Sequence, residues 1–262
     1  MTESPLTGRV ALITGATSGI GENTAHMFAA RGATVVVSGR QADRGAAVAS
    51  AIQAGGGEAI FIQADVAETD QVHQLVSDTV ARCGGLDFAF NNAGIFDRMH
   101  ELHEYSDDAW DDMIAINLSG VFRCMKHQIT AMLELPDPPL GGRSIVNNAS
   151  TVGHRGSERA SPAYVAAKHG VIGLTKQAAV QYVTRGIRVN AVSPGPTLTP
   201  VAQPLVDEGP DAVQAALANL NPLATFVTAD EVAEAVLFLC SPAAAMINGH
   251  DIPLDGGQLA KL

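Results

Sequence analysis

Short apolar runs rich in valine and isoleucine alternate along the chain with longer segments of helical periodicity. This alternation is typical of βαβ units, in which parallel strands are buried on both faces and joined by helices. The pattern therefore predicts an α/β fold: a doubly wound, seven-stranded parallel sheet with helices on both faces.

The apolar runs predict strands near residues 9–14, 34–38, 58–63, 87–91, 143–149, 187–193 and 251–254. The intervening segments predict helices near residues 19–31, 41–54, 68–83, 106–134, 162–185 and 229–240. Two stretches depart from the alternation. Residues 135–142 form a Pro/Gly connection, and we interpret residues 196–227 as a substrate-covering flap, because long insertions in compact domains are usually functional. We expect residues 1–262 to form one domain, which is ordinary for this length.

Charge and cysteine usage restrict the partners and the compartment. A formal net charge of -11 argues against nucleic-acid binding and gives no reason to expect attraction to anionic membranes. No apolar run reaches the roughly 20 residues that a membrane span requires. Three dispersed cysteines and an N-terminus without a signal peptide favour a reducing, cytoplasmic setting. His100 and His103 lack a third ligand, so we expect no catalytic metal.

A glycine-rich loop follows the first predicted strand: Thr14-Gly15-Ala16-Thr17-Ser18-Gly19-Ile20-Gly21. Its glycines fall at a helix N-terminus, where free N–H groups and the helix dipole favour a pyrophosphate. A turn without a ligand would give the same glycines, but the position after the first strand favours binding. The loop contains the whole TGxxxGIG pattern and resembles that of the short-chain dehydrogenase/reductase family, which implies a Rossmann-type fold.

Three residues form a candidate catalytic group. Tyr164 and Lys168 are four apart on a predicted helix that Ser161-Pro162 begins, so both project from one face. A phenol becomes a useful acid or base near neutral pH only if a nearby cation stabilises the phenolate. The alternative is a packed tyrosine beside a solvated lysine. Ser150 ends the fifth strand at the edge where doubly wound sheets bind ligands, with Thr151 as the alternative hydroxyl.

The resemblance assigns further roles. Asn117 matches the helix asparagine that shapes a water-filled proton path to the lysine, and it completes a catalytic set with Ser150, Tyr164 and Lys168. The residues that the resemblance implies as cofactor contacts are Gly15, Thr17, Ser18, Gly19, Ile20, Arg40, Asp65, Val66, Asn92, Ala93, Gly94, Tyr164, Lys168, Pro194, Gly195, Thr197 and Thr199. For Asp65, a helix cap is the alternative. The Asn91-Asn92-Ala93-Gly94 motif is also expected to brace the central sheet.

The residues at the end of the second predicted strand indicate whether the cofactor is NAD or NADP. An acidic side chain there would hold the ribose 2′-hydroxyl of NAD, whereas a basic one would pair with the extra phosphate of NADP. The sequence reads Ser38-Gly39-Arg40. Gly39 stands where NAD-preferring members of the family carry Asp, so NADP(H) is favoured. A solvated arginine is the alternative, and it leaves NAD(H) open.

The combined motifs predict an enzyme that transfers a hydride between NAD(P) and a ketone or secondary alcohol, with a small-molecule substrate. One alternative is a 3-oxoacyl thioester reductase acting on a carrier-protein or coenzyme A substrate, and another is a non-catalytic dinucleotide sensor. Ile95, Phe96, Val152, His154 and the predicted flap are expected to set substrate identity. The resemblance also implies a homotetramer assembled through the helices near 106–134 and 162–185 and the C-terminal region.

Overall fold

The computed structural model describes residues 6–136, 142–199 and 202–261. In this part of the chain, seven strands form one sheet in which every neighbouring pair is parallel. The strands are β1 (Val10–Thr14), β2 (Thr34–Gly39), β3 (Glu58–Gln63), β4 (Phe88–Asn91), β5 (Arg143–Asn148), β6 (Ile187–Pro194) and β7 (Asp251–Leu254). Each lies within one residue of its predicted bounds, and the predicted fold class is confirmed.

The strand order places the site. The sheet runs β3-β2-β1-β4-β5-β6-β7, so the chain builds outward in one direction from β1 and then in the other from β4. Thr14 of β1 and Asn91 of β4 pair at the ends of these two central strands. In doubly wound sheets, ligands bind beyond the carboxyl ends of the strands at such a switch point.

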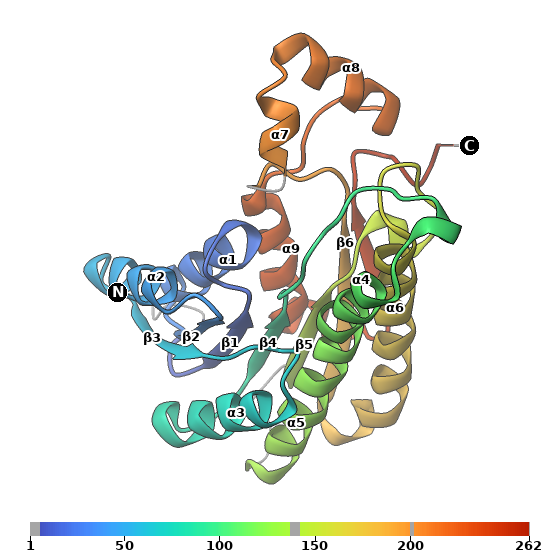
Figure 1. Cartoon of the computed structure of the whole chain (residues 1–262). Helices are drawn as coiled ribbons and strands as arrows, with labels where there is room; N and C mark the ends of the chain where they lie inside the picture. Colours follow the sequence, from blue (N-terminus) through green and yellow to red (C-terminus); the bar gives the residue numbers. More distant parts are fainter. Residues whose placement is uncertain (1–5, 137–141, 200–201, 262) are drawn as a thin grey trace.

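Helices cover both faces of the sheet (Figure 1). The helices of the described residues are α1 (Gly19–Ala30), α2 (Ala42–Ala54), α3 (Thr69–Cys83), α4 (Asp107–Ile114), α5 (Gly120–Glu134), α6 (Pro162–Tyr182), α7 (Gln203–Val206), α8 (Pro210–Leu220) and α9 (Ala229–Cys240). Side chains of α1, α2 and α9 form one buried apolar cluster, whereas those of α3, α5 and α6 form another. Alternate strand residues enter opposite clusters, as Leu12 and Ile13 do, because successive side chains point to opposite faces.

Two predicted segments differ in the structure. The helix expected over 106–134 is interrupted by a π turn, Ala115–Ser119, between α4 and α5. The segment 196–227 contains α7 and α8, which stand above the carboxyl edge of the sheet (Figure 1). Parts of this segment (200–201) and of the Pro/Gly connection (137–141) lie outside the described residues.

Candidate active site

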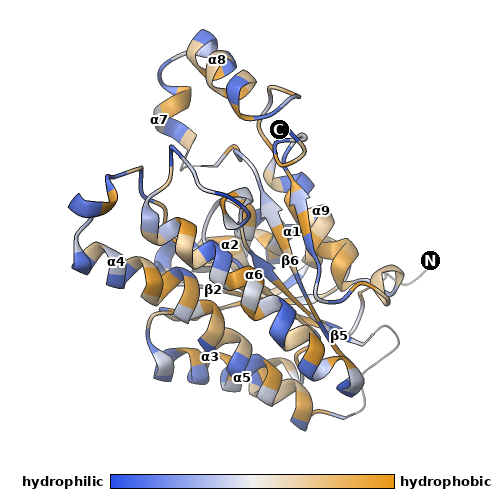
Figure 2. Cartoon of the chain, turned by 90° about the vertical axis from the view of Figure 1, so that its right-hand side faces the viewer, coloured by the Kyte–Doolittle hydropathy of each residue, from blue (hydrophilic) through white to orange (hydrophobic). Residues whose placement is uncertain are grey.

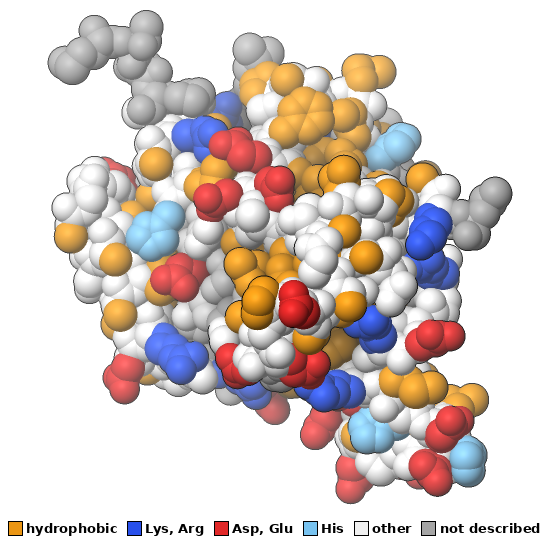
Figure 3. Space-filling view, turned by 90° about the horizontal axis from the view of Figure 1, so that it is seen from above, with side chains coloured by type: hydrophobic (Ala, Val, Ile, Leu, Met, Phe, Trp, Pro, Cys, Tyr) orange, Lys and Arg blue, Asp and Glu red, His pale blue; other side chains and the backbone are white. Residues whose placement is uncertain are grey.

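Two adjoining cavities open at the carboxyl edge of the sheet. The first, of about 390 Å³, lies over the glycine loop and the ends of β2 and β3. The second, of about 1030 Å³, lies between the end of β5, the start of α6 and the helices α7 and α8. Asn92, Gly94 and Ile95 line both cavities, so the two are continuous. Seen from above, hydrophobic side chains gather over the middle of this face (Figure 3).

The glycine loop leaves a helix terminus without a side-chain cap. Gly15 and Gly19 have φ of +64° and +59°, a left-handed conformation that glycine adopts without strain. Ser18 is the N-cap of α1, but its side chain makes no capping hydrogen bond. The first N–H groups of α1 therefore remain available at the first cavity, where they and the helix dipole favour an anion.

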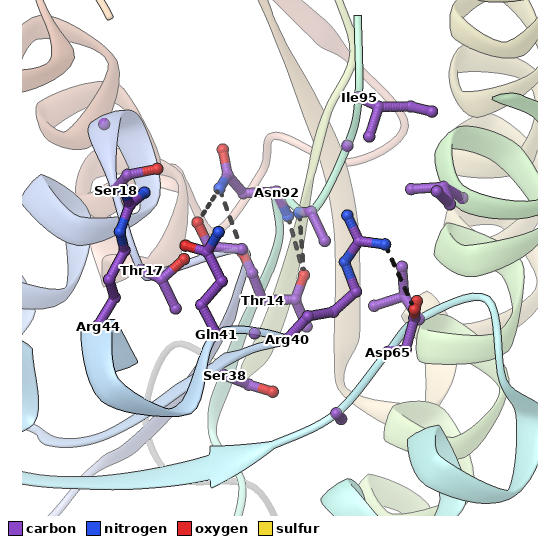
Figure 4. A pocket seen from close by; sticks show the side chains of 18 of the residues that line it. Thr14, Thr17, Ser18, Ser38, Arg40, Gln41, Arg44, Asp65, Asn92 and Ile95 are labelled. Carbon is purple, nitrogen blue, oxygen red and sulfur yellow. Dashed lines mark hydrogen bonds and ion pairs between the residues drawn. The ribbon is translucent and has the colours of Figure 1, made fainter. Parts of the chain in front are cut away.

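Asn92 ties the loop to the centre of the sheet. Its side-chain amide donates to the carbonyls of Thr14 (3.1 Å) and Gly15 (3.0 Å), and it accepts from Asn148 Nδ2 (2.9 Å). The preceding Asn91 is buried and bonds Gln128 and Asn147 by its side chain. Asn91 therefore links β4 to α5 and β5, while Asn92 faces the cavity (Figure 4).

Two arginines that follow the end of β2 line the first cavity. Arg40 pairs with Asp65 at 3.6 Å, and its side chain is 60% exposed. Figure 4 shows Arg44, which the sequence analysis did not single out, extending instead towards Ser18. A Cβ on Gly39 would lie 2.8 Å from Cγ2 of Thr17, so that threonine occupies the space of an acidic side chain at the end of β2.

Asp65 also acts within the backbone. Its Oδ1 accepts from the N–H of Ala67 (3.0 Å) in the loop before α3, whose N-cap is Glu68, so Asp65 does not cap that helix. Asp65 and Val66 line the first cavity, which is compatible with the binding interpretation.

Helix α6 brings Tyr164 and Lys168 to the second cavity. Ser161 caps the helix by accepting from the N–H of Tyr164 (3.2 Å), and Pro162 occupies its first turn. One helical turn later, Lys168 Nζ lies 5.5 Å from the centroid of the Tyr164 ring. The same Nζ donates to the Asn148 carbonyl at 2.6 Å. The ammonium is therefore fixed between the end of β5 and the phenol.

Burial shifts the pKa of both side chains. It raises the pKa of Tyr164 to about 12, and the Ser150 hydroxyl opposes this by hydrogen bonding to the phenol. Burial lowers the pKa of Lys168 to about 8. At neutral pH the phenol is thus protonated and can give up a proton, while the lysine is close to its titration range.

Ser150 lies where the chain turns from β5 towards α6. The Ser193 hydroxyl of β6 donates to its carbonyl (3.1 Å), which fixes the turn, and both Ser150 and Thr151 line the second cavity. His154 differs from expectation. It pairs with Asp251 of β7 and is not among the residues that line either described cavity, whereas Ile95, Phe96 and Val152 are.

Asn117 lines neither cavity. It is buried in the π turn, where its side chain accepts from the N–H of Ile95 (2.8 Å) and donates to the carbonyl of Ile95 (2.7 Å). π turns often occur at functional sites because they redirect a side chain within a helix. Here the π turn braces the segment after β4, which forms a wall common to both cavities. The catalytic role expected for Asn117 stays a prediction.

The remaining predicted contacts are divided between the two cavities. Those at the first are Gly15, Thr17, Ser18, Gly19, Ile20, Arg40, Asp65, Val66, Asn92, Ala93, Gly94 and Thr199. Those at the second are Ser150, Tyr164, Lys168, Pro194, Gly195, Thr197 and Thr199. No motif pointed to Gln41 and Arg44 at the first cavity or to Arg98 and Gln258 at the second. Arg44 could have been found from its spacing, because it lies one helical turn after Arg40.

Within the described ranges, no group of three or more His, Cys, Asp or Glu side chains is arranged to hold a metal ion. No helix in the same ranges is long and apolar enough to cross a membrane.

Comparisons with known proteins agree with this architecture. A family model described as enoyl-(acyl carrier protein) reductase matches residues 15–258. The chain is 40% identical over 252 residues to an A-factor type gamma-butyrolactone 1'-reductase (1S-forming) of Streptomyces virginiae, covering 96% of each protein. It is 39% identical to a cyclohexanol dehydrogenase of Acinetobacter sp., covering 97% of this chain and 96% of that protein.

Solved structures give the same result at the level of the fold. The crystal structure of levodione reductase superimposes with a TM-score of 0.89 and 36% identity, covering 98% of this chain and 100% of that one. A short-chain type dehydrogenase/reductase from Mycobacterium marinum gives a TM-score of 0.89 and 33% identity over 99% of this chain and 98% of that one. The chain belongs to the short-chain dehydrogenase/reductase family, and it is a nicotinamide-dependent oxidoreductase of alcohols and ketones.

Proposed function

We propose that this enzyme interconverts a cyclic ketone and its secondary alcohol with NADP(H), using Tyr164 as the proton donor and acceptor. The observation that carries the proposal is the buried arrangement of Tyr164 and Lys168 at a cavity that continues into the glycine-loop cavity. Relatives named cyclohexanol dehydrogenase and cis-4-hydroxycyclohexanecarboxylate dehydrogenase support a ring-bearing substrate. The names of the relatives do not favour a thioester substrate or a sensor without catalysis.

The residues at the first cavity suit a dinucleotide. The uncapped N-terminus of α1 would hold the pyrophosphate, and Arg40 and Arg44 would face an additional phosphate on the ribose. When bound, the nicotinamide group supplies or accepts the hydride at the substrate carbon. Pro194, Gly195, Thr197 and Thr199 would hold its carboxamide end.

The chain's own residues move the proton. In reduction, the Ser150 hydroxyl donates a hydrogen bond to the substrate oxygen, and Tyr164 transfers its phenolic proton to the same oxygen. In oxidation, the phenolate takes the proton back. A nearby positive charge favours the phenolate, so the Lys168 ammonium, 5.5 Å from the centroid of the Tyr164 ring, would ease the loss of the phenolic proton. Lys168 would also hold the nicotinamide ribose.

The free thiols Cys83, Cys124 and Cys240 are compatible with the reducing, cytoplasmic compartment that we propose.

Replacement of Tyr164 tests the catalytic assignment. We expect Tyr164→Phe to lower kcat/KM for cyclohexanone by at least about 1000-fold, since the variant lacks the transferable proton while keeping the ring. Cofactor binding, followed by the fluorescence of the reduced cofactor, should change little. Tyr182→Phe on the same helix is the matched control and should retain full activity. Activity of Tyr164→Phe close to that of the wild type would refute the assignment.

Replacement of Arg40 tests the cofactor preference. Loss of a charge-assisted hydrogen bond to phosphate should weaken NADPH binding about 10- to 100-fold in Arg40→Ala. NADH binding should change little, because NADH lacks that phosphate. Arg31→Ala, which removes a surface partner of Glu234, is the control. Equal weakening of both cofactors, or tighter NADH binding by the wild type, would contradict the preference.

A further inference from the structure

The second cavity contains a buried amide with no protein partner. Gln258 follows the last strand, lines the cavity and is only 5% exposed. Its Oε1 is enclosed and accepts no hydrogen bond, and its Nε2 donates none to any described residue. Buried polar groups without partners are rare in folded proteins because desolvation is then uncompensated. Nε2, unlike Oε1, is not fully enclosed, so a ligand in the cavity can pair with this end of the amide.

The turn that carries Gln258 is rigidly held. The Asp255 carboxylate accepts from the N–H groups of Gly257 (2.9 Å) and Leu259 (2.8 Å) on either side of Gln258. The Gln258 N–H donates to the Asp255 carbonyl (3.2 Å). The backbone from which Gln258 extends is thus fixed before ligand binding, which reduces the entropy lost on binding.

The orientation of the amide defines what it can bind. A Cβ on Gly195 would lie 3.1 Å from Oε1 of Gln258, so the carbonyl end packs against the backbone of Gly195. With Oε1 enclosed there, Nε2 is the end that faces the cavity. Gln258 thus offers a hydrogen-bond donor, which an acceptor oxygen on the ligand would pair with.

No described residue of the cavity accepts a hydrogen bond from Nε2. The flap side is mostly apolar: it includes Leu205, Ala212, Ala216, Leu220 and Phe226, with Glu208 as its charged residue. In the proposed reaction, Ser150 and Tyr164 both act on the single oxygen of the reacting carbon. A ketone with no other polar group offers no acceptor to Nε2. A substrate with a second oxygen would pair with this donor.

We propose that Gln258 is a specificity-determining residue whose Nε2 donates a hydrogen bond to a second oxygen atom of the substrate, remote from the reacting carbon. This inference rests on the proposed ketone–alcohol reaction and narrows its substrate class to oxygenated cyclic ketones and alcohols. The residue takes no part in proton transfer, so its contribution is to substrate binding.

Matched ketones test the inference in steady-state kinetics with NADPH. Cyclohexanone is compared with tetrahydropyran-4-one and 4-methoxycyclohexanone, whose added oxygens only accept hydrogen bonds and extend to different distances. The variants are Gln258→Leu, which removes the donor, and Gln258→Glu, whose carboxylate cannot donate. Gln74→Leu, an exposed position on α3, is the control.

We expect the wild type to favour at least one oxygenated ketone, and each Gln258 variant to lose about 10-fold of that preference, mainly through KM. Activity on cyclohexanone and NADPH binding should remain near those of the wild type. A preference unchanged in Gln258→Leu, an equal loss on all three ketones, or weaker NADPH binding with the preference intact would overturn the inference. A wild type inactive on all three ketones would instead refute the proposed function on which the inference rests.

Discussion

Lys168 is the residue at which folding and the proposed chemistry oppose each other. Its side chain is 5% exposed and donates to the Asn148 carbonyl, and none of the ion pairs among the described residues includes it. Burial lowers its pKa from 10.5 to about 8, so keeping the ammonium charged at neutral pH costs free energy of folding. The proposed reaction nevertheless needs that charge beside the phenol.

We therefore expect Lys168→Met to be more stable than the wild type and inactive. The variant removes a buried charge and loses one hydrogen bond, for a net gain of about 2 kcal/mol at pH 7. That gain corresponds to a rise in Tm of about 5 °C for a chain of this size. Lys176→Met, at an exposed position of the same helix, is the control and should leave Tm almost unchanged. Thermal unfolding of the cofactor-free proteins measures the difference.

The pH dependence of this gain tests its cause. The folded chain binds the Lys168 proton only below about pH 8, whereas the unfolded chain keeps it up to about pH 10.5. The contribution of Lys168 to wild-type stability therefore becomes less unfavourable as pH rises from 8 to 10.5. The advantage of Lys168→Met should be largest below pH 8 and shrink across this window. An advantage that does not vary with pH would assign the gain to packing instead.

At the scale of elements, the sequence was sufficient for the strands and for most helices. Buried parallel strands and amphipathic helices differ strongly in periodicity, so their bounds agree with the structure to within a few residues. The segment 106–134 was predicted as one helix because a π turn changes the backbone register without changing the apolar pattern greatly. Asn117 was the local signal, since asparagine is unfavourable inside an α-helix.

The site was predictable where motifs lie next to strand ends and not elsewhere. The glycine loop, Ser150 and Tyr164 follow from their places in the order of elements. Gln258 did not, because its position in the cavity depends on the turn held by Asp255 after the final strand. His154 was expected at the substrate, but it pairs with Asp251 and lines neither described cavity, and this pairing joins two segments far apart in sequence.

At the scale of the whole molecule, α5 and α6 lie along one side (Figures 1 and 2), and apolar side chains on both helices remain exposed. Phe122 on α5 is 52% exposed and Val180 on α6 is 78% exposed. Single exposed apolar residues are ordinary, but several on one side indicate a surface that another protein covers. Since most soluble oligomers are symmetric assemblies of identical chains, a second copy of this chain is the simplest partner.

We propose the homotetramer that the family resemblance implied, with α5 and α6 in its interfaces. Light scattering after size-exclusion chromatography should then give four times the 27.1 kDa chain mass. Phe122→Glu should lower that mass, because a buried, unpaired carboxylate is costly at an interface between copies that already carry a net charge of -11 each. Leu102→Glu, at an exposed loop position, should leave it unchanged. A wild type that elutes as a monomer would show that these apolar side chains are tolerated in solvent, and the remaining surface would then have to keep the chain soluble through its charge alone.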